Sequence, residues 1–203
     1  MARPRQVSDE EILRVARVCF LRDGATVPTS TIAQEVGLSQ GAIFKRFSTK
    51  ENLMLCALAP PPEPGWLTLV GDGPAAGPVD EQLVQIGIEA VGFFRHIMPA
   101  ILVLKSAGIS HADMLKRYKL PPPIFAVRRM SVWFEKGVQN GRIRSKQPDQ
   151  MAVSFVGSLQ MRVFLQLMFG DWSSVFVSDE QYVRGLVSDL WNGIGVELEE
   201  DEA

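Results

Sequence analysis

The chain of 203 residues is divided by one stretch that cannot form a continuous helix. Residues 59–78 contain six of the 13 prolines together with four glycines. Proline lacks an amide donor and disfavours the helical conformation in the residue before it, so a helix that begins near Lys50 cannot pass Pro60. This stretch therefore predicts a boundary between a small N-terminal domain and a larger C-terminal one.

The proline-rich stretch is itself too apolar for a free linker, because it carries Trp66, Leu67, Leu69 and Val70. We expect it to pack onto the C-terminal domain, since exposed apolar patches of that size are uncommon. The predicted organisation is a head over residues 1–58, a connection over 59–79 and a body over 80–203.

Helical periodicity dominates on both sides of the connection. Ser8 is placed to cap the first helix in a capping box with Glu11, and Asp149 and Asp179 to cap the last two. Pro99 is expected to kink or restart the helix in which it lies. The predicted helices are Asp9–Asp23, Thr29–Val36, Ser39–Phe47, Lys50–Ala59, Asp80–Met98 with a restart at Ile101–Leu104, Ser110–Tyr118, Pro121–Gly141, Asp149–Gly170 and Asp179–Gly195. Only the short Ser174–Val177 resembles a strand, so the fold class expected is all-α.

The composition is that of a soluble globular protein, with 46% hydrophobic and 22% charged residues. Cys19 and Cys56 lie among apolar neighbours and are expected to be reduced thiols, as in a cytoplasmic protein. The N-terminus has no signal-peptide core, and no stretch of about 18 apolar residues lacks an interruption. We therefore expect a cytoplasmic protein that neither is exported nor spans a membrane.

Charge is distributed unevenly along the chain, whose formal net charge is −2. Residues 1–56 hold eight basic and six acidic residues, whereas acid is concentrated in the tail Glu197–Glu202. A mildly basic head on an acidic body is compatible with nucleic-acid binding by the head alone.

The sequence of residues 32–47 predicts two short helices joined by a tight turn at Gly37, which is the arrangement of a helix-turn-helix. Val36, Leu38, Ile43 and Phe47 supply a buried face, and Ser39 is placed to cap the second helix. The exposed first turn of that helix can then enter a major groove. The alternative is a helical hairpin of an ordinary bundle, in which the exposed polar residues and Gly41 would have no packing role.

The first quarter of the chain resembles the tetracycline-repressor (TetR) family of bacterial regulators. The residues that carry this resemblance are Phe20, Gly24, Thr29, Ile32-Ala33, Gly37-Leu38-Ser39, Gly41, Ile43-Phe44, Phe47 and Lys50-Glu51-Asn52-Leu53. So many matches at fixed spacing make the resemblance specific.

The resemblance implies a role for each matching head residue. Gln40 and Ala42 would contact base edges or the groove floor, and Lys45 a base or a phosphate. Lys50, together with Thr29 or Ser30, would hold phosphates. Phe44 replaces the usual tyrosine and Arg46 the usual histidine, so the phosphate contact should shift toward Arg46 and Lys50. The implied DNA-binding set is Thr29, Ser30, Ser39, Gln40, Gly41, Ala42, Phe44, Lys45, Arg46 and Lys50. Arg3 and Arg5 are either a minor-groove arm or a disordered basic tail.

The last two predicted helices carry wide apolar stripes. The resemblance implies that they pair with their copies in a homodimer through Phe155, Leu159, Val163, Val183, Leu186, Val187, Leu190, Trp191 and Ile194. The alternative is that these stripes belong to the core of a single chain.

Methionine and aromatic residues are frequent in the body, and the resemblance implies a pocket there for an apolar small-molecule effector. The candidate lining is Phe93, Phe94, Met98, Leu102, Met130, Trp133, Phe134, Met161 and Phe164. Read from the sequence alone, core packing is the favoured interpretation of each single residue, since such residues fill any helical bundle.

No catalytic motif, metal-ligand spacing or phosphate-binding loop is present, so neither an enzyme nor a cofactor is expected. The function expected is that of a bacterial transcriptional repressor, released from operator DNA by an apolar ligand. An activator, a regulator without a ligand, and an apolar-ligand carrier or enzyme with a vestigial head are the alternatives.

Overall fold

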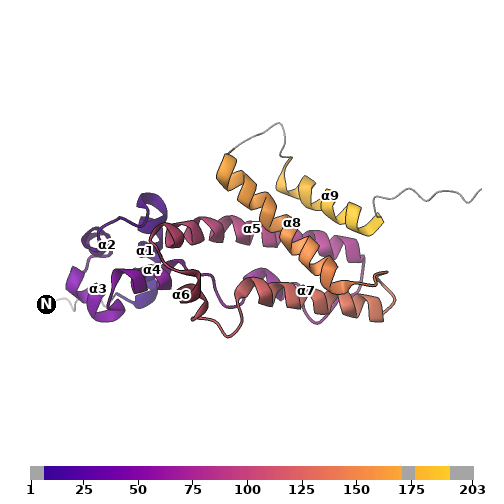
Figure 1. Ribbon diagram of the computed structural model, residues 1–203, viewed down its shortest axis with the longest axis horizontal. Coiled ribbons are helices and arrows are strands. Elements are labelled where there is room, and N and C mark those ends of the chain that lie inside the picture. The colour runs from indigo at the N-terminus through magenta and orange to yellow at the C-terminus, as the bar shows by residue number, and fades with distance from the viewer. Residues whose placement is uncertain (1–6, 171–176, 193–203) are drawn as a thin grey trace, which may run out of the picture. The chain divides into compact units, whose positions relative to one another are not determined.

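The computed structural model describes residues 7–170 and 177–192 (Figure 1). Within these ranges the chain forms α-helices and one short 3₁₀ helix and contains no strand, so the predicted all-α class is confirmed. Arg3, Arg5, Ile194, the tail Glu197–Glu202 and all but the last residue of the predicted strand lie outside the described residues.

The helices follow the predicted order closely. They are α1 (Asp9–Asp23), α2 (Thr29–Val36), α3 (Gln40–Phe47), α4 (Lys50–Leu58), η1 (Gly65–Thr68), α5 (Val79–Ser106), α6 (His111–Leu115), α7 (Pro122–Gln139), α8 (Pro148–Phe169) and α9 (Asp179–Asn192). Helix α4 ends at Leu58, so the prediction that this helix does not pass Pro60 is confirmed.

Backbone contacts group the chain into two compact units. The first combines Met1–Pro62 with Arg95–Pro122, and the second combines Glu63–Phe94 with Pro123–Ala203. Helix α5 therefore belongs to both units, its first half to the second unit and its second half to the first. The division at residues 58 and 79 stays a prediction.

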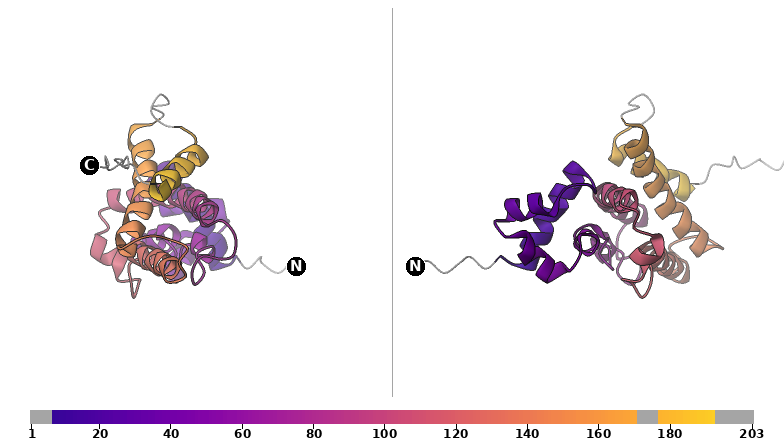
Figure 2. Two further views of the ribbon diagram at one scale, coloured as in Figure 1. Left: turned by 90° about the vertical axis from the view of Figure 1, so that its right-hand side faces the viewer. Right: turned by 60° about the vertical axis from the view of Figure 1, so that its left-hand side comes forward.

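The first unit contains α2 and α3, whose ribbons have the indigo to purple colours of Figure 2. Its core combines fully buried residues of α1 to α4, among them Phe20, Ile32, Ile43 and Leu53, with Leu104 from the second half of α5. The core of the first unit is therefore formed by α1 to α4 together with the second half of α5.

The second unit is built on aromatic side chains. Trp66 of η1 meets Phe94 of α5 edge-on at 6.3 Å between ring centroids, and Phe134 of α7 meets Phe155 of α8 at 6.5 Å. Helix α9 lies against α8 (Figure 1). The burial of Trp66 confirms that the connection packs instead of forming a free linker.

Helix α5 continues through Pro99, so of the kink or restart expected there the restart does not occur; the apolar pattern that drives its burial persists at Ala100 and Leu104. Two expectations about helix caps are wrong. Pro148 begins α8, so Asp149 lies inside the first turn and is not its cap. Ser178 supplies the cap of α9, accepting from the Gln181 amide at 3.2 Å.

Asp179, expected to cap α9, instead accepts a hydrogen bond from Arg162 at 3.0 Å. Arg162 is buried on α8, where its guanidinium also donates to the Val177 carbonyl and stacks on the Tyr182 ring. A buried cation needs such partners, so this cluster fixes how α8 and α9 pack together.

Helices α5 and α8 are long and apolar enough, by length and composition alone, to cross a membrane. Core helices of soluble proteins meet the same criterion. Both helices here place a fully buried apolar face against the rest of the chain, represented by Ile86 on α5 and Phe155 on α8.

Two glycines of α5 provide a test of this packing. A Cβ added at Gly87 would lie 2.6 Å from Val183 of α9 and 3.3 Å from Phe155 of α8, whereas one at Gly92 would meet nothing within 4 Å. We expect Gly87→Ala to lower the free energy of unfolding by about 1–3 kcal/mol through overpacking. Gly92→Ala should raise it by up to about 1 kcal/mol, because alanine favours the helix. Urea denaturation measures both, and equal effects of the two substitutions would contradict the packing.

Candidate DNA-binding interface

The turn between α2 and α3 depends on a left-handed residue. Gly37 ends α2 at φ +79° and ψ 32°, a conformation that strains any residue with a Cβ. The amide of Leu38 bonds back to the Ala33 carbonyl at 2.9 Å, which closes the end of α2. The predicted helix-turn-helix is thereby confirmed.

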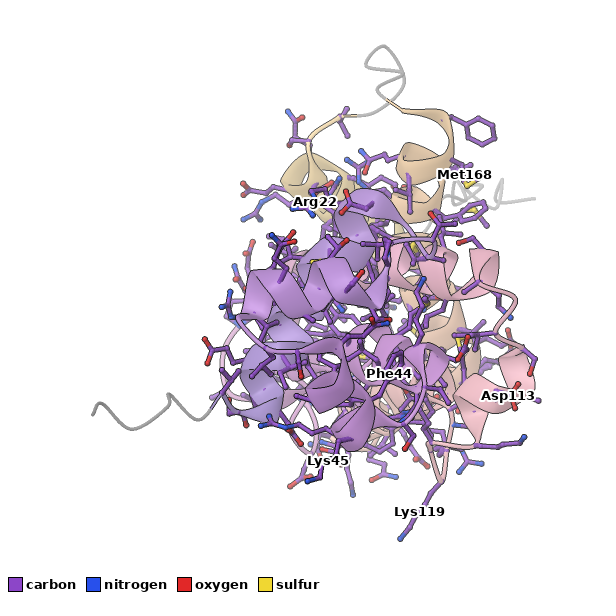
Figure 3. The ribbon with its side chains drawn as sticks, turned by 90° about the vertical axis from the view of Figure 1, so that its left-hand side faces the viewer. Arg22, Phe44, Lys45, Asp113, Lys119 and Met168 are labelled. Atoms are coloured by element: carbon purple, nitrogen blue, oxygen red, sulfur yellow. The ribbon has the colours of Figure 1, made fainter. Side chains whose placement is uncertain are left out.

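Ser39 begins α3 as predicted, since its Oγ accepts from the Ala42 amide at 3.1 Å. Ile43 and Phe47 are buried, and Gln40, Gly41 and Lys45 are exposed. Figure 3 shows Phe44 and Lys45 on α3, with the Lys45 side chain directed outward. One side of α3 therefore packs on the head, and its first turn is open to a partner.

The junction of α3 and α4 is fixed by polar contacts that sequence analysis missed. The Asn52 amide group donates to the Phe47 carbonyl at 2.9 Å, and Thr49 caps α4 by accepting from the Asn52 backbone amide at 3.0 Å. Ser48 between the helices has a positive φ of 63°, which is uncommon for a residue with a side chain. These bonds hold α3 at a set angle to α4.

The residues expected to hold phosphates differ in accessibility. Ser30 is exposed in the first turn of α2, whereas Thr29 is buried, with 4% of its surface accessible. Lys50 is half-buried in the first turn of α4. Ser30 and Lys50 are thus the accessible members of this group, at the ends of helices whose amides favour anions.

Arg46 is engaged within the head. Its guanidinium donates to the Val7 carbonyl at 2.7 Å and to the Asp9 carboxylate at 3.1 Å. These bonds connect Val7, which precedes α1, and Asp9, at the start of α1, to α3. A guanidinium has five donor hydrogens, so a phosphate contact is compatible with this role and stays a prediction.

Arg17 connects α1 to two other helices of the first unit. It donates to the Ala57 carbonyl near the end of α4 at 3.2 Å and to the His96 carbonyl of α5 at 2.9 Å. Burial lowers the pKa of its guanidinium, and its buried Nε has no hydrogen-bond partner among the residues that the structure describes. Nothing in the sequence pattern marks this contact, because both acceptors are backbone atoms.

At the surface Arg22 pairs with its neighbour Asp23 on α1 at 2.6 Å and links α1 to α2 through Glu35 at 2.7 Å. Hydrogen bonds from Arg22 lower the pKa of both carboxyls, but exposed pairs of this kind contribute little to stability. Burial, then the nearby Glu35, raises the pKa of the Cys19 thiol to about 11, which matches the expected inert thiol.

The two compact units differ in the net charge of their sequences. The first unit contains 13 basic and seven acidic residues, and the second contains eight and 16. Within the first unit, the second half of α5 and the segment that follows it carry more basic than acidic residues. The unit that carries α3 therefore has the positive charge that nucleic acid attracts.

The nine candidate ligand residues differ in burial. Phe94, Met130, Trp133 and Phe134 are buried in the second unit, where aromatic rings pack on one another. Phe93 and Met98 are half-buried, while Leu102, Met161 and Phe164 are exposed. The hollows that border η1 in the second unit are lined by other residues, and the apolar ligand site stays a prediction.

Most of the candidate dimer residues already belong to the core of a single chain. Phe155, Leu159, Val163, Val183 and Val187 are each at most 2% accessible. They offer almost no surface to a partner, and the ring of Phe155 packs on Phe134 of α7. Leu186 and Leu190 are half-buried, and Trp191 is exposed.

The free apolar surface lies instead on the opposite side of α8. It consists of Val153, Met161, Phe164, Leu167, Met168 and Phe169, and Figure 3 shows Met168 near the end of the helix. Val153, Met161, Phe164 and Met168 follow helical spacing, and a Cβ added at Gly157 between them would meet nothing within 4 Å. We call this set the α8 outer face.

The chain is similar to known regulators in both sequence and fold. Residues 12–56 match the family described as bacterial regulatory proteins, tetR family. No curated protein matches the chain.

Solved structures with the same fold cover nearly the whole chain. GusR of Salmonella enterica has 17% identity and a TM-score of 0.64, over 95% of this chain and 98% of its own. PfmR, a TetR family regulator from Thermus thermophilus, has 19% identity and a TM-score of 0.62, over 91% and 99%. AibR, solved with isovaleryl coenzyme A and operator DNA, has 19% identity and a TM-score of 0.58, over 90% and 97%.

A substitution at Gly41 can show whether this glycine is needed for the fold or for DNA binding. A Cβ at this position would meet only the Ser39 Oγ at 3.9 Å, so nothing inside the protein requires glycine there. We expect Gly41→Ala to raise the free energy of unfolding by about 0.5–1 kcal/mol and yet to weaken DNA binding by about tenfold or more, because the methyl group occupies space at the groove. Gly92→Ala is the matched control, with a similar gain in stability and unchanged DNA affinity. Unaltered DNA binding by Gly41→Ala would contradict this interface.

Proposed function

We propose that this chain, which belongs through residues 12–56 to the tetR family of bacterial regulatory proteins, is a homodimeric repressor that an apolar small molecule releases from operator DNA. It is a DNA-binding transcriptional regulator. The observation that carries the proposal is the exposed first turn of α3, fixed by the Gly37 turn and the Ser39 cap.

In the proposed complex α3 enters the major groove by its first turn. Gln40 reads a base edge, Ala42 contacts the groove floor, and Ser30 with Lys50 holds the phosphates on either side. Lys45, exposed farther along α3, reaches a phosphate or a base. This division of roles predicts different consequences for different substitutions.

Response to a ligand is proposed to pass through α5, since this single helix contributes to both compact units. A ligand that binds the second unit and favours one arrangement of α5 shifts the population of head arrangements that fit DNA. AibR, which has the same fold, was solved with both a ligand and operator DNA, and this supports a ligand response here. We further propose a cytoplasmic location and no enzymatic activity, in keeping with a regulator.

Two substitutions in the head test the division of roles on a DNA fragment that the protein selects from genomic DNA. Lys50→Ala should weaken binding to all sequences equally and reduce the salt dependence by about one phosphate contact. Gln40→Ala should leave the salt dependence unchanged and relax preference at one base pair, worth about 1–3 kcal/mol of discrimination. Binding curves at several salt concentrations distinguish the two outcomes. Uniform loss with both variants would refute the assignment.

The homodimer is proposed to form through the α8 outer face, where Phe164 is 41% and Met168 50% accessible. Phe164→Lys should convert the dimer to a monomer in sedimentation experiments while the helical content is retained, since the side chain is outside the intrachain core. Ile124→Lys is the matched control, because Ile124 of α7 is 48% accessible but lies outside that face. A Phe164→Lys protein that remains dimeric would exclude the proposed interface.

A further inference from the structure

Three helices of the first unit meet at the side chain of Arg17. One terminal nitrogen of its guanidinium donates to the Ala57 carbonyl of α4 at 3.2 Å, and the other donates to the His96 carbonyl of α5 at 2.9 Å. The second half of α5 lies beside α1 and α4 (Figure 1), and its Ala100 and Leu104 belong to the same core. Arg17 thus joins the end of α4 to the helix that contributes to both compact units.

The end of α4 cannot complete its own hydrogen bonds. In a longer helix the carbonyls of residues 56–58 would accept from amides four residues later, but residues 60–62 are three prolines. Donors for this turn have to come from side chains or water. Arg17 supplies one, and the Tyr118 hydroxyl donates to the Pro60 carbonyl at 2.6 Å. Side chains from outside α4 therefore determine where its last turn lies.

The turn of α5 that Arg17 contacts is also weakened by a proline. Pro99 has no amide to donate to the Arg95 carbonyl, and its ring crowds the turn that precedes it. His96 lies in that turn. Because helices bend most readily where a proline removes a bond from their interior, this turn is where α5 can change direction with the smallest loss.

The contact of Arg17 with both helices is not fully satisfied. Among the described residues Arg17 forms no ion pair with a carboxylate, burial lowers the pKa of its guanidinium, and its buried Nε has no hydrogen-bond partner. A partly buried cation with an unsatisfied donor regains solvation when it is released to water. A small movement of either carbonyl can therefore break the contact, as expected of an element with two arrangements.

We propose that Arg17 is a positioning residue that couples α5 to the DNA-binding helices. While its guanidinium bridges the end of α4 and the Pro99 turn of α5, α4 holds α3, to which it is bonded through Asn52, at the angle that fits the major groove. Movement of the Pro99 turn breaks the bridge and lowers the population of the DNA-binding arrangement. The inference rests on the proposed function, since it names the residue through which the ligand response reaches the head.

The first test measures hydrogen exchange of the full-length protein with and without the DNA fragment that it selects. DNA binding should slow amide exchange at residues 100–106 of α5 by about fivefold or more. In Arg17→Met, which keeps the aliphatic stem, this slowing should fall below about twofold while α3 stays protected. Arg14→Met is the matched control and should retain the full slowing, because Arg14 is exposed on the same helix and carries the same charge.

Binding curves separate positioning from direct phosphate contact. Arg17→Met should weaken DNA binding by about three- to tenfold with an unchanged salt slope, because a positioning residue releases no counterions. Arg17→Lys is a second variant, which keeps the charge but replaces the forked guanidinium by a single nitrogen, and it should lose about half of the slowing or more. Full slowing at α5 in both variants, an equal loss in Arg14→Met, or a reduced salt slope in Arg17→Met would overturn the proposal.

A second measurement needs no DNA and separates this proposal from the proposed function. Pro99→Ala restores the missing amide of α5 and should slow amide exchange at residues 53–58 of α4 by about threefold or more, but not when it is combined with Arg17→Met. Such coupling in a protein that binds no DNA would support the role of Arg17 and contradict the proposed function. DNA binding without this coupling would leave the proposed function intact and reject Arg17 as the link.

Discussion

The orientation of α3 depends on one short turn whose geometry is set by Gly37 and Ser39. Gly37 adopts the left-handed conformation that lets the chain reverse within three residues, and Ser39 terminates the turn by capping α3. Asn52 then holds the far end of α3 against α4. A helix of only eight residues is marginal by itself, so these contacts and the burial of Ile43 and Phe47 are what keep α3 in place.

Much of the head could be predicted because its signals are local. The caps at Ser8 and Ser39, the end at Gly37 and the spacing of Ile43 and Phe47 each depend on residues within one or two turns. The contacts made by Arg17 could not be predicted, since its acceptors are backbone carbonyls 40 and 79 residues away. For the same reason the bond from Arg46 to the Val7 carbonyl could not be predicted.

The helices of the body show what an amphipathic pattern cannot predict. Helix α8 is apolar on two sides, and the sequence does not indicate which side faces its own chain. Phe155 and Leu159 are buried, whereas Met161 and Phe164 are accessible. Pro99 marks another limit, because the burial of Ala100 and Leu104 outweighs the single hydrogen bond that proline removes from α5. That α5 contributes to both units follows from neither composition nor periodicity.

The central claim is that two copies of α3 read DNA from a symmetric dimer. The most direct measurement is the sequence that the purified protein selects from a random DNA pool, together with its footprint. The account predicts an inverted repeat whose half-site centres are separated by about one helical turn or more, with protection of the phosphates that flank each half-site. Selection of no sequence at low salt, or of a single half-site by a monomer, would contradict it.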